Sequence, residues 1–386
     1  MDPLSWPQIL FLTAQQLLPV WIGIVLTFAL SIRFKRRLGL YGKLFDSGVG
    51  MAGFALVLFW LFTALFADWI ITHDPLAQVS QMRNALPGTP LPEAEGRYPY
   101  YLFGGDGLAR DVFSRAVMGA REVLRIAPAA AAISFMIGIL LGLPAGYVGG
   151  KLDVGLTFLA NLVLAFPVIL LFFLLVAPEI QDTPIPRVSA GILFLAPLVF
   201  LTLLLNARFF TQPSRRNLYV GGVLAVGAWA YAGLVFNADP TGFWSMSPNL
   251  LNVFVAVVFI NAPTVFRIVR GITMDIKTRD YVAAAQTRGE GRWYIMLWEI
   301  LPNARGPLIV DFCLRIGYTT ILLGTLGFFG LGVSPESPDW GSTINQGRRL
   351  LTVYPHAALV PALSLMSLVL GLNLLADCLR EESLKD

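Results

Sequence analysis

Long apolar runs separated by short polar segments make up almost the whole chain. A helix needs roughly 20 apolar residues to cross the hydrocarbon core of a membrane. Nine segments meet this requirement, so the pattern predicts an all-α integral membrane protein. The first segment contains Gln15 and Gln16, and it could instead be a helix that lies at the membrane interface. The predicted spans are 9–32, 48–71, 123–148, 153–177, 189–210, 217–237, 251–270, 307–332 and 356–377.

The composition agrees with this class. Of the 386 residues, 56% are hydrophobic and 13% are charged, whereas soluble domains carry about 25% charged residues. The two cysteines, Cys313 and Cys378, lie in or beside predicted spans, which argues against a disulfide framework. The net charge of +4 requires no nucleic acid as a partner, because basic residues of membrane proteins collect in cytoplasmic loops beside the lipid bilayer.

The distribution of Lys and Arg predicts the orientation of the spans. Basic residues concentrate at 33–43, 208–216 and 267–306. The first of these clusters follows the first apolar run, which is the reverse of a cleaved signal peptide, so we expect an uncleaved span with its N-terminus outside. Nine crossings then place all three basic segments in the cytoplasm and place 72–121 and 333–355 outside.

Four glycines share one face of the predicted span at 123–148. Gly138, Gly142, Gly146 and Gly150 recur every four residues, so they leave a smooth surface to which another helix can come close. This surface is either a plain packing face or a face with a role in transport.

Charged residues and prolines inside spans are unusual. Asp311 and Arg315 lie four residues apart, and a charge costs about 2.5–3.5 kcal/mol at the middle of a membrane. At this spacing the two can form an intramembrane ion pair, either near the cytoplasmic interface or lining a transport pathway. Pro144, Pro167 and Pro263 each free a backbone carbonyl and permit a kink.

The chain lacks the residue constellations that enzymes need. Its two histidines, His73 and His356, are far apart in sequence, and no HExxH, CxxC or GxSxG motif is present. We therefore expect no catalytic residues, no metal site and no cofactor. The string GYVGGKL at 146–152 is the nearest to a phosphate-binding loop, but its spacing is wrong and no Ser or Thr follows Lys151. If ATP drives transport, another chain must hydrolyse it.

A polar stretch at 280–308 interrupts the pattern between two predicted spans. Its first part, 280–288, is expected to be a short helix, and 292–301 is expected to be a second helix that ends at Pro302. Two such helices at an angle on a cytoplasmic surface would form a docking element for a partner. This interpretation rests on the small residues Ala283, Ala284 and Ala285, the helix breakers Gly289 and Gly291, and an apolar face of Trp293, Met296, Leu297 and Ile300.

The same stretch resembles a known loop. Its residues follow the pattern A-A-(x)3-G-(x)11-L-P, which is similar to the EAA loop of ATP-binding-cassette import permeases. In that family the loop inserts into a cleft of the ATPase subunit. The matching residues are Ala284, Ala285, Gly289, Leu301 and Pro302, and Ala283 stands where the family has Glu.

Three further segments resemble the C-type permease subunit of dipeptide, oligopeptide and nickel importers. FGGDGLARDVFSRAVMGAR at 103–121 is similar to its external motif, with Gly105 in place of Thr and Ala109 in place of Gly. The segments 328–348 and 373–381 resemble the same subunit's external loop and C-terminal end. The candidate residues of the external motif are Asp106, Arg110, Asp111, Ser114 and Arg115.

The stretch 111–121 is expected to be an amphipathic helix at the outer membrane surface. Its charged face either anchors the helix at the interface, with Asp106 or Asp111 capping it, or receives the solute-binding protein.

The resemblance implies the transmembrane domain of a type I ABC importer, with six core helices plus about three extra ones. The expected organisation is an extra helix and basic linker at 1–47, a first core helix at 48–71, an external segment at 72–121, a core at 122–378 that a two-helix insertion at about 178–250 interrupts, and a cytoplasmic tail at 379–386.

The resemblance also implies a function. The chain would be a permease subunit of the bacterial inner membrane that forms half of the translocation pathway for peptides or a related small solute. A second homologous permease, two ATPase subunits and an external solute-binding protein are the implied partners. The alternative is an ion-coupled secondary transporter, which Asp311, as the one clear acid inside a core span, does not favour. A structural scaffold would not explain the loop. The substrate, the role of the extra helices at 9–32 and 189–237 and the residues that line the pathway stay open.

Overall fold

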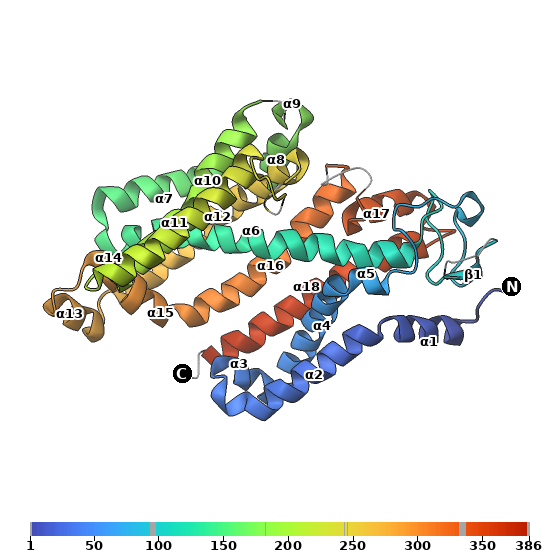
Figure 1. Cartoon of the computed structure of the whole chain (residues 1–386), viewed down its shortest axis with the longest axis horizontal. Helices are drawn as coiled ribbons and strands as arrows, with labels where there is room; N and C mark the ends of the chain where they lie inside the picture. The colour runs from blue at the N-terminus through green and yellow to red at the C-terminus, as the bar shows by residue number, and fades with distance from the viewer. Residues whose placement is uncertain are drawn as a thin grey trace. The chain divides into compact units, whose positions relative to one another are not determined.

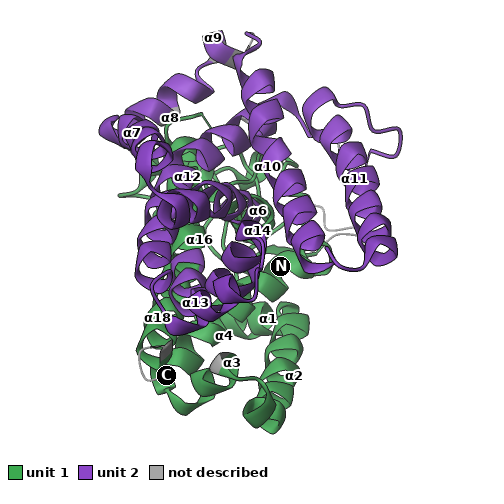
Figure 2. Cartoon of the chain, turned by 90° about the vertical axis from the view of Figure 1, so that its left-hand side faces the viewer, with its two compact units in different colours: residues 1–128, 313–386 green, residues 129–312 purple. Residues whose placement is uncertain are grey.

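The computed structural model describes residues 2–92, 98–181, 183–242, 244, 246–331 and 337–383. The chain forms two compact units (Figure 2). Unit 1 comprises Met1–Pro128 and Cys313–Asp386, and unit 2 comprises Ala129–Phe312. Two helices, α6 (Val112–Val148) and α16 (Arg305–Phe328), belong partly to each unit.

Unit 1 is built from both ends of the chain (Figure 1). Its remaining helices are α1 (Trp6–Gln16), α2 (Leu18–Phe34), η1 (Lys35–Arg37), α3 (Leu40–Lys43), η2 (Leu44–Asp46), α4 (Gly48–Leu65), α5 (Ala67–Ile70), η3 (Ser80–Met82), α17 (Trp340–Gly347), η5 (Arg348–Leu350) and α18 (His356–Ser383). A short antiparallel pair, β1 (Thr89–Pro90) and β2 (Tyr100–Tyr101), lies in the segment between α5 and α6.

The regular elements among the described residues of unit 2 are all helices. Besides its parts of α6 and α16, its helices are α7 (Gly150–Ala165), α8 (Val168–Val176), α9 (Pro178–Gln181), α10 (Ile185–Arg208), α11 (Pro213–Phe236), α12 (Pro248–Ile276), α13 (Asp280–Thr287), α14 (Arg292–Tyr294), η4 (Ile295–Ile300) and α15 (Leu301–Asn303).

The predicted spans correspond to long apolar helices. Within the described residues, eight helices are long and apolar enough to cross a membrane, and α7 with α8 makes nine if this bent pair is one crossing. The first span, predicted at 9–32, is wrong in its extent, because α1 ends at Gln16 and a separate α2 begins at Leu18. Polar Gln15 and Gln16 end the first helix, and Pro19 starts the second, since proline suits a first helical turn. The Gln16 side chain turns to donate to the Ile70 carbonyl at 2.8 Å.

The span predicted at 153–177 is two helices rather than one. α7 and α8 meet at a 90° bend, and the break falls at Phe166 and Pro167. Proline has no N–H to donate, and it favours an extended residue before it, as Phe166 is with φ −76° and ψ 140°. The kink that Pro167 predicted is confirmed.

The ends of three long helices meet at one end of unit 2, at the left of Figure 1. Lys277, just after α12, donates to the carbonyl of Gly146 near the end of α6 at 2.8 Å. Trp298 donates to the carbonyl of Leu204 near the end of α10 at 3.2 Å. α6 and α10 both end here, so α10 must begin at the opposite end of unit 2. The helices α7 and α8, which lie between them in sequence, must therefore take the chain from this end to the opposite one. The basic segment 208–216 therefore lies at the same end as α13–α15, as the charge distribution predicted.

The glycine face of α6 packs against α12. A Cβ on Gly138 would lie 2.5 Å from Val265, and a Cβ on Gly142 or Gly146 would lie 2.8 or 2.7 Å from atoms of α12. No side chain fits at these distances, so the glycines set the separation of the two helices. Gly150 does not share this role, because it follows the end of α6, has φ +62°, and its Cβ would meet nothing within 4 Å.

In unit 1, α4 packs against α18 in a similar way. A Cβ on Gly53 would lie 2.8 Å from Leu374, and Trp60 donates to the Ser367 hydroxyl at 2.9 Å. The extra helix α2 lies against α4 but leaves most of its apolar residues exposed. The basic turn at 33–43 lies beside α18, since α3 and η2 both pack on that helix.

We expect Gly142→Ala to lower the thermal stability of the purified protein. Its added methyl would overlap Val269, and overpacking of this kind costs about 1–3 kcal/mol. Gly155→Ala is the matched control, because Gly155 is an exposed helical residue with free space around it. That variant should be as stable as the parent or slightly more so. Equal melting temperatures for the two variants would contradict the packing role of Gly142.

Candidate functional site

The polar stretch at 280–308 folds into two short helical pieces joined by a tight turn. The first is α13, and the second runs through α14, η4 and α15. Gly289 in the turn has φ +76°, a backbone conformation that favours glycine, so the predicted glycine break is confirmed. The second piece ends at Asn303, one residue after Pro302, and not before that proline as predicted. It contains a six-residue π turn, Ile295–Ile300, which the sequence did not predict.

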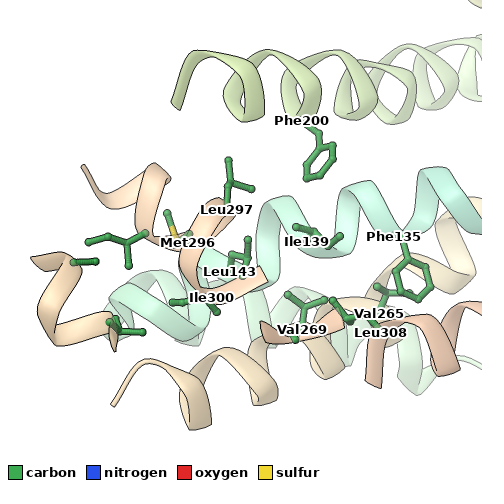
Figure 3. Packing of buried hydrophobic residues seen from close by; sticks show 14 residues of the cluster. Phe135, Ile139, Leu143, Phe200, Val265, Val269, Met296, Leu297, Ile300 and Leu308 are labelled. Carbon is green, nitrogen blue, oxygen red and sulfur yellow. The ribbon is translucent and has the colours of Figure 1, made fainter. Parts of the chain in front are cut away.

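One face of this element is buried in an apolar cluster that we call the loop core (Figure 3). The two helical pieces meet α6, α12 and the first turn of α16 in this cluster, and Trp293 packs at its edge. The predicted apolar face is therefore confirmed. The buried members of the loop core are Phe135, Ile139, Leu143, Phe200, Val265, Val269, Val282, Ala285, Ile295, Met296, Leu297, Ile300, Ala304 and Leu308.

The three alanines of α13 do not share one face. Ala283 and Ala284 are exposed, as are Gln286 and Gly289. Ala285 is 0% exposed and belongs to the loop core. The expectation that Ala285 offers a contact surface to a partner is therefore wrong, and its small side chain serves packing instead. The surface open to a partner is formed by the exposed side of α13 together with the turn that follows it.

An ion pair braces the turn. The Arg288 guanidinium lies 2.8 Å from a Glu299 carboxylate oxygen and 3.9 Å from a Glu290 carboxylate oxygen. Glu299 belongs to the π turn, so the pair links the end of α13 to the second helical piece. Partial burial raises the pKa of the Tyr281 hydroxyl, at the start of α13, above its usual value.

The external motif forms a second polar centre, in unit 1. Asp106 accepts hydrogen bonds from the backbone N–H groups of Leu108 and Arg110 at 2.8 and 2.9 Å, and the Arg110 side chain donates to it at 2.8 Å. Arg110 also donates to the Gln346 side chain. This arrangement closes the turn in front of α6 and ties it to α17.

Asp111 caps α6. Its carboxylate accepts from the Ser114 backbone N–H at 3.1 Å and from the Ser114 hydroxyl at 2.6 Å, in the pattern of an N-terminal cap. The Thr72 hydroxyl donates to the same carboxylate at 2.8 Å. Of the two aspartates considered as caps, Asp111 is the one that holds the helix terminus.

Arg115 joins α6 to the segment around α17. Its guanidinium donates to the Thr343 hydroxyl at 2.9 Å and to the Ser337 carbonyl at 3.2 Å. Trp340 adds a second link, because its indole N–H donates to the Ala116 carbonyl at 2.8 Å. The buried Trp340 was not singled out from the sequence, although it stands within the motif at 328–348. Residues 332–336 of that motif lie outside the described residues.

The prediction of a charged helix lying on the membrane surface at 111–121 is wrong. α6 is one helix of 37 residues, and the five motif residues are nearly inaccessible to solvent. Each charge has buried partners, so the motif is a structural centre and not a surface for the binding protein. The exposed fractions are 2% for Asp106, 3% for Arg110 and 0% for Asp111, Ser114 and Arg115.

The remaining candidate residues are two charged residues of α16 and the two histidines. Asp311 and Arg315 are four residues apart on α16, and Asp311 is 9% exposed. The ion pair between them stays a prediction. His73 and His356 both contact backbone carbonyls near the external motif, those of Tyr98 at 2.9 Å and of Gly105 at 3.2 Å. Among the described residues, no three His, Cys, Asp or Glu side chains are grouped so that they could hold a metal ion.

We expect Arg115→Met to destabilise the protein strongly. About 1–3 kcal/mol is lost for each buried carbonyl or hydroxyl that is left without its donor. Arg121→Met is the control on the same helix, because Arg121 is partly exposed and pairs with Asp68 on the surface, where the hydrogen bond lowers the pKa of that carboxyl. Thermal unfolding in detergent should show a much larger shift for Arg115→Met. A larger shift for Arg121→Met would contradict the structural role of the buried centre.

The chain is similar in sequence to several transport permease proteins. A glutathione transport system permease protein of Pectobacterium atrosepticum is 29% identical over 287 residues, which cover 74% of this chain and 73% of that protein. A di/tripeptide transport system permease protein of Pseudomonas aeruginosa is 28% identical over 331 residues, or 86% of each chain. A probable D,D-dipeptide transport system permease protein of Escherichia coli is 26% identical over 326 residues, or 84% of each chain.

The profile of one family covers most of the chain. The binding-protein-dependent transport system inner membrane component matches residues 138–381. This match confirms the predicted resemblance to an importer permease and the all-α transmembrane domain of the type I class. The chain therefore belongs to the family of binding-protein-dependent transport system inner membrane components, which are multi-pass proteins of the bacterial inner membrane.

Proposed function

We propose that this chain is one permease subunit of an ATP-binding-cassette importer and forms half of a translocation pathway. Membership of the family supports this proposal. The substrate we propose is a peptide or a related small solute, because similar proteins are named as permeases for dipeptides, tripeptides and glutathione. Nothing in the described residues favours the ion-coupled alternative.

The main support for the proposed mechanism is the structure of the segment from Lys277 to Ala304, which we call the coupling loop. Its apolar face is buried in the loop core, while Ala283, Ala284 and Gly289 are exposed on the side away from it. Small exposed side chains let a cleft on another protein come close. A tightly packed core transmits displacement, because packed side chains resist compression.

The coupling loop would transmit movement between the membrane helices and an ATPase subunit. α12 leads into the loop and α16 leads out of it, and both contribute to the loop core. A rigid-body shift of α13 would therefore move these two helices directly. ATP would be hydrolysed by two partner subunits, and a second homologous permease and an external solute-binding protein would complete the importer.

We expect Ala284→Glu to weaken binding of the ATPase subunits while the permease still folds. The added side chain projects into solvent in the free permease but would enter the proposed cleft, where misfit costs about 1–3 kcal/mol. That cost corresponds to about a 5- to 150-fold loss of association. Co-purification from membranes and ATPase activity stimulated by substrate and binding protein are the measurements.

Ser214→Glu is the matched control for Ala284→Glu. Ser214 is exposed in the first turn of α11, at the same end of unit 2, and it lies outside the coupling loop. This variant should keep normal association and normal stimulation. If Ala284→Glu also behaves like the parent in both assays, the docking proposal fails.

Ala285→Glu should have a different effect from its neighbour. The new carboxylate would be buried in the loop core with no partner, and an uncompensated buried charge costs about 3–5 kcal/mol. We expect less folded permease in the membrane and a lower melting temperature, before any partner is added. Gly289→Trp is a poorer probe of docking, because φ +76° strains any side chain there.

A further inference from the structure

The helical hairpin α10–α11 is not used by the proposed function. It falls within the two-helix insertion that the sequence predicted at about 178–250. The two helices lie side by side (Figure 2), and the Tyr231 hydroxyl of α11 donates to the Gly191 carbonyl of α10 at 3.0 Å. Most of α11 is exposed, whereas α10 also packs against α12 and the second helical piece of the coupling loop.

The C-terminal half of α10 enters the loop core. Phe200 is 9% exposed and points from α10 toward the α6 turn that carries Ile139 (Figure 3). Leu203 and Leu204, on the following turn, pack at the edge of the same cluster. α10 therefore covers the coupling loop and α6 from the side, and it buries apolar surface that would otherwise face lipid or water.

Two polar contacts fix the last turn of α10 to the π turn of the coupling loop. The indole N–H of Trp298 donates to the Leu204 carbonyl at 3.2 Å. The Arg208 guanidinium lies 4.7 Å from the centre of the Trp298 ring, within the range of a cation–π interaction. Arg208 also sits at the C-terminal end of α10, where the helix dipole favours a positive charge. Trp298 thus takes part in both contacts, donating the hydrogen bond through its N–H and contacting the cation through its ring.

The other half of α10 is fixed to α12. The rings of Phe194 and Phe254 lie 5.6 Å apart, close enough for a favourable aromatic contact. α10 is therefore attached to α12 along one half and to the coupling loop at its end. Because α10 contacts both α12 and the coupling loop, it restrains the loop relative to α12, the helix that leads into it.

We propose that α10 braces the coupling loop and that Arg208 and Trp298 are positioning residues, which hold the second helical piece in the orientation needed to engage an ATPase subunit. This proposal rests on the proposed docking of the loop. It assigns a role to the inserted hairpin, which adds a lateral support that the core helices do not provide. Loss of the brace should loosen the loop without removing its contact surface.

The experiment titrates purified ATPase subunits onto the permease complex in lipid nanodiscs and measures stimulated ATPase activity. Arg208→Gln removes the cation, and we expect the half-saturating ATPase concentration to rise about twofold to fivefold, as for an exposed cation–π contact. Arg208→Lys keeps a cation over the ring and should restore most of the affinity. Arg215→Gln is the control, because Arg215 is exposed in the neighbouring turn and its contact with Gln212 is local.

A double-variant cycle tests whether Arg208 acts through Trp298. Trp298→Leu should raise the half-saturating concentration more than Arg208→Gln does, because it removes the ring and the hydrogen bond together. Adding Arg208→Gln to Trp298→Leu should then change nothing further, since the cation no longer has a ring to contact. Melting temperatures of the permease alone report any general loss of stability, and we expect Arg208→Gln to leave them unchanged.

The outcomes separate the two proposals. If Ala284→Glu abolishes association while Arg208→Gln, Arg208→Lys and Arg215→Gln all match the parent, the brace is overturned and the docking proposal stands. Additive effects in the double variant also overturn the brace. If Ala284→Glu has no effect on association, docking fails and the brace fails with it.

Discussion

The close approach of α6 and α12 is the contact on which the rest of unit 2 depends. Lipid offers no hydrophobic driving force between helices, so their association relies on tight packing. Gly138, Gly142 and Gly146 remove the side chains that would separate the two helices, and Val265 and Val269 of α12 lie over the first two glycines. Both valines also belong to the loop core. The packing that joins two membrane helices therefore continues without interruption into the coupling loop beyond them.

In unit 1, the end that carries the external motif combines close glycine contacts, such as Gly119 against Trp340, with buried charges that link its elements. Asp106, Asp111 and Arg115 are buried, but each has a helix terminus, a carbonyl or an opposite charge as its partner. Removing one partner leaves the others desolvated, which makes such a network costly to disturb. The network joins the segment after α5, the turn before α6, and α17. Burial also raises the pKa of Asp339, which caps α17 beside this network.

Much of the fold could be predicted from the sequence because hydropathy, glycine spacing and the positive-inside bias are local signals. Pro167 predicts a kink between α7 and α8, but the size of the bend, 90°, could not be predicted, because hydropathy averages across Phe166 and Pro167. The burial of Arg115 was missed because a charged residue in a polar run has the same pattern whether water or a partner satisfies it. Ala284 and Ala285 are the same residue type and point in directions about 100° apart around the helix axis. Only the packing around the helix decides which of them is buried. The three-residue spacing of buried Val282 and Ala285 was the available signal.

The hairpin α10–α11 leaves the connection from α12 into the coupling loop intact. α10 and α11 run in opposite directions, so the chain returns to the end of unit 2 where α10 begins, and α12 leads from there to the coupling loop at the other end. α10 ends on the side where the loop lies, which places Arg208 and Leu204 within reach of Trp298. α11 returns along the outside of α10 and leaves most of its apolar surface exposed, as suits a helix that faces lipid. The number of crossings therefore places the end of α10 at the same end of unit 2 as the coupling loop. The aromatic and apolar residues at that end determine whether α10 stabilises the loop.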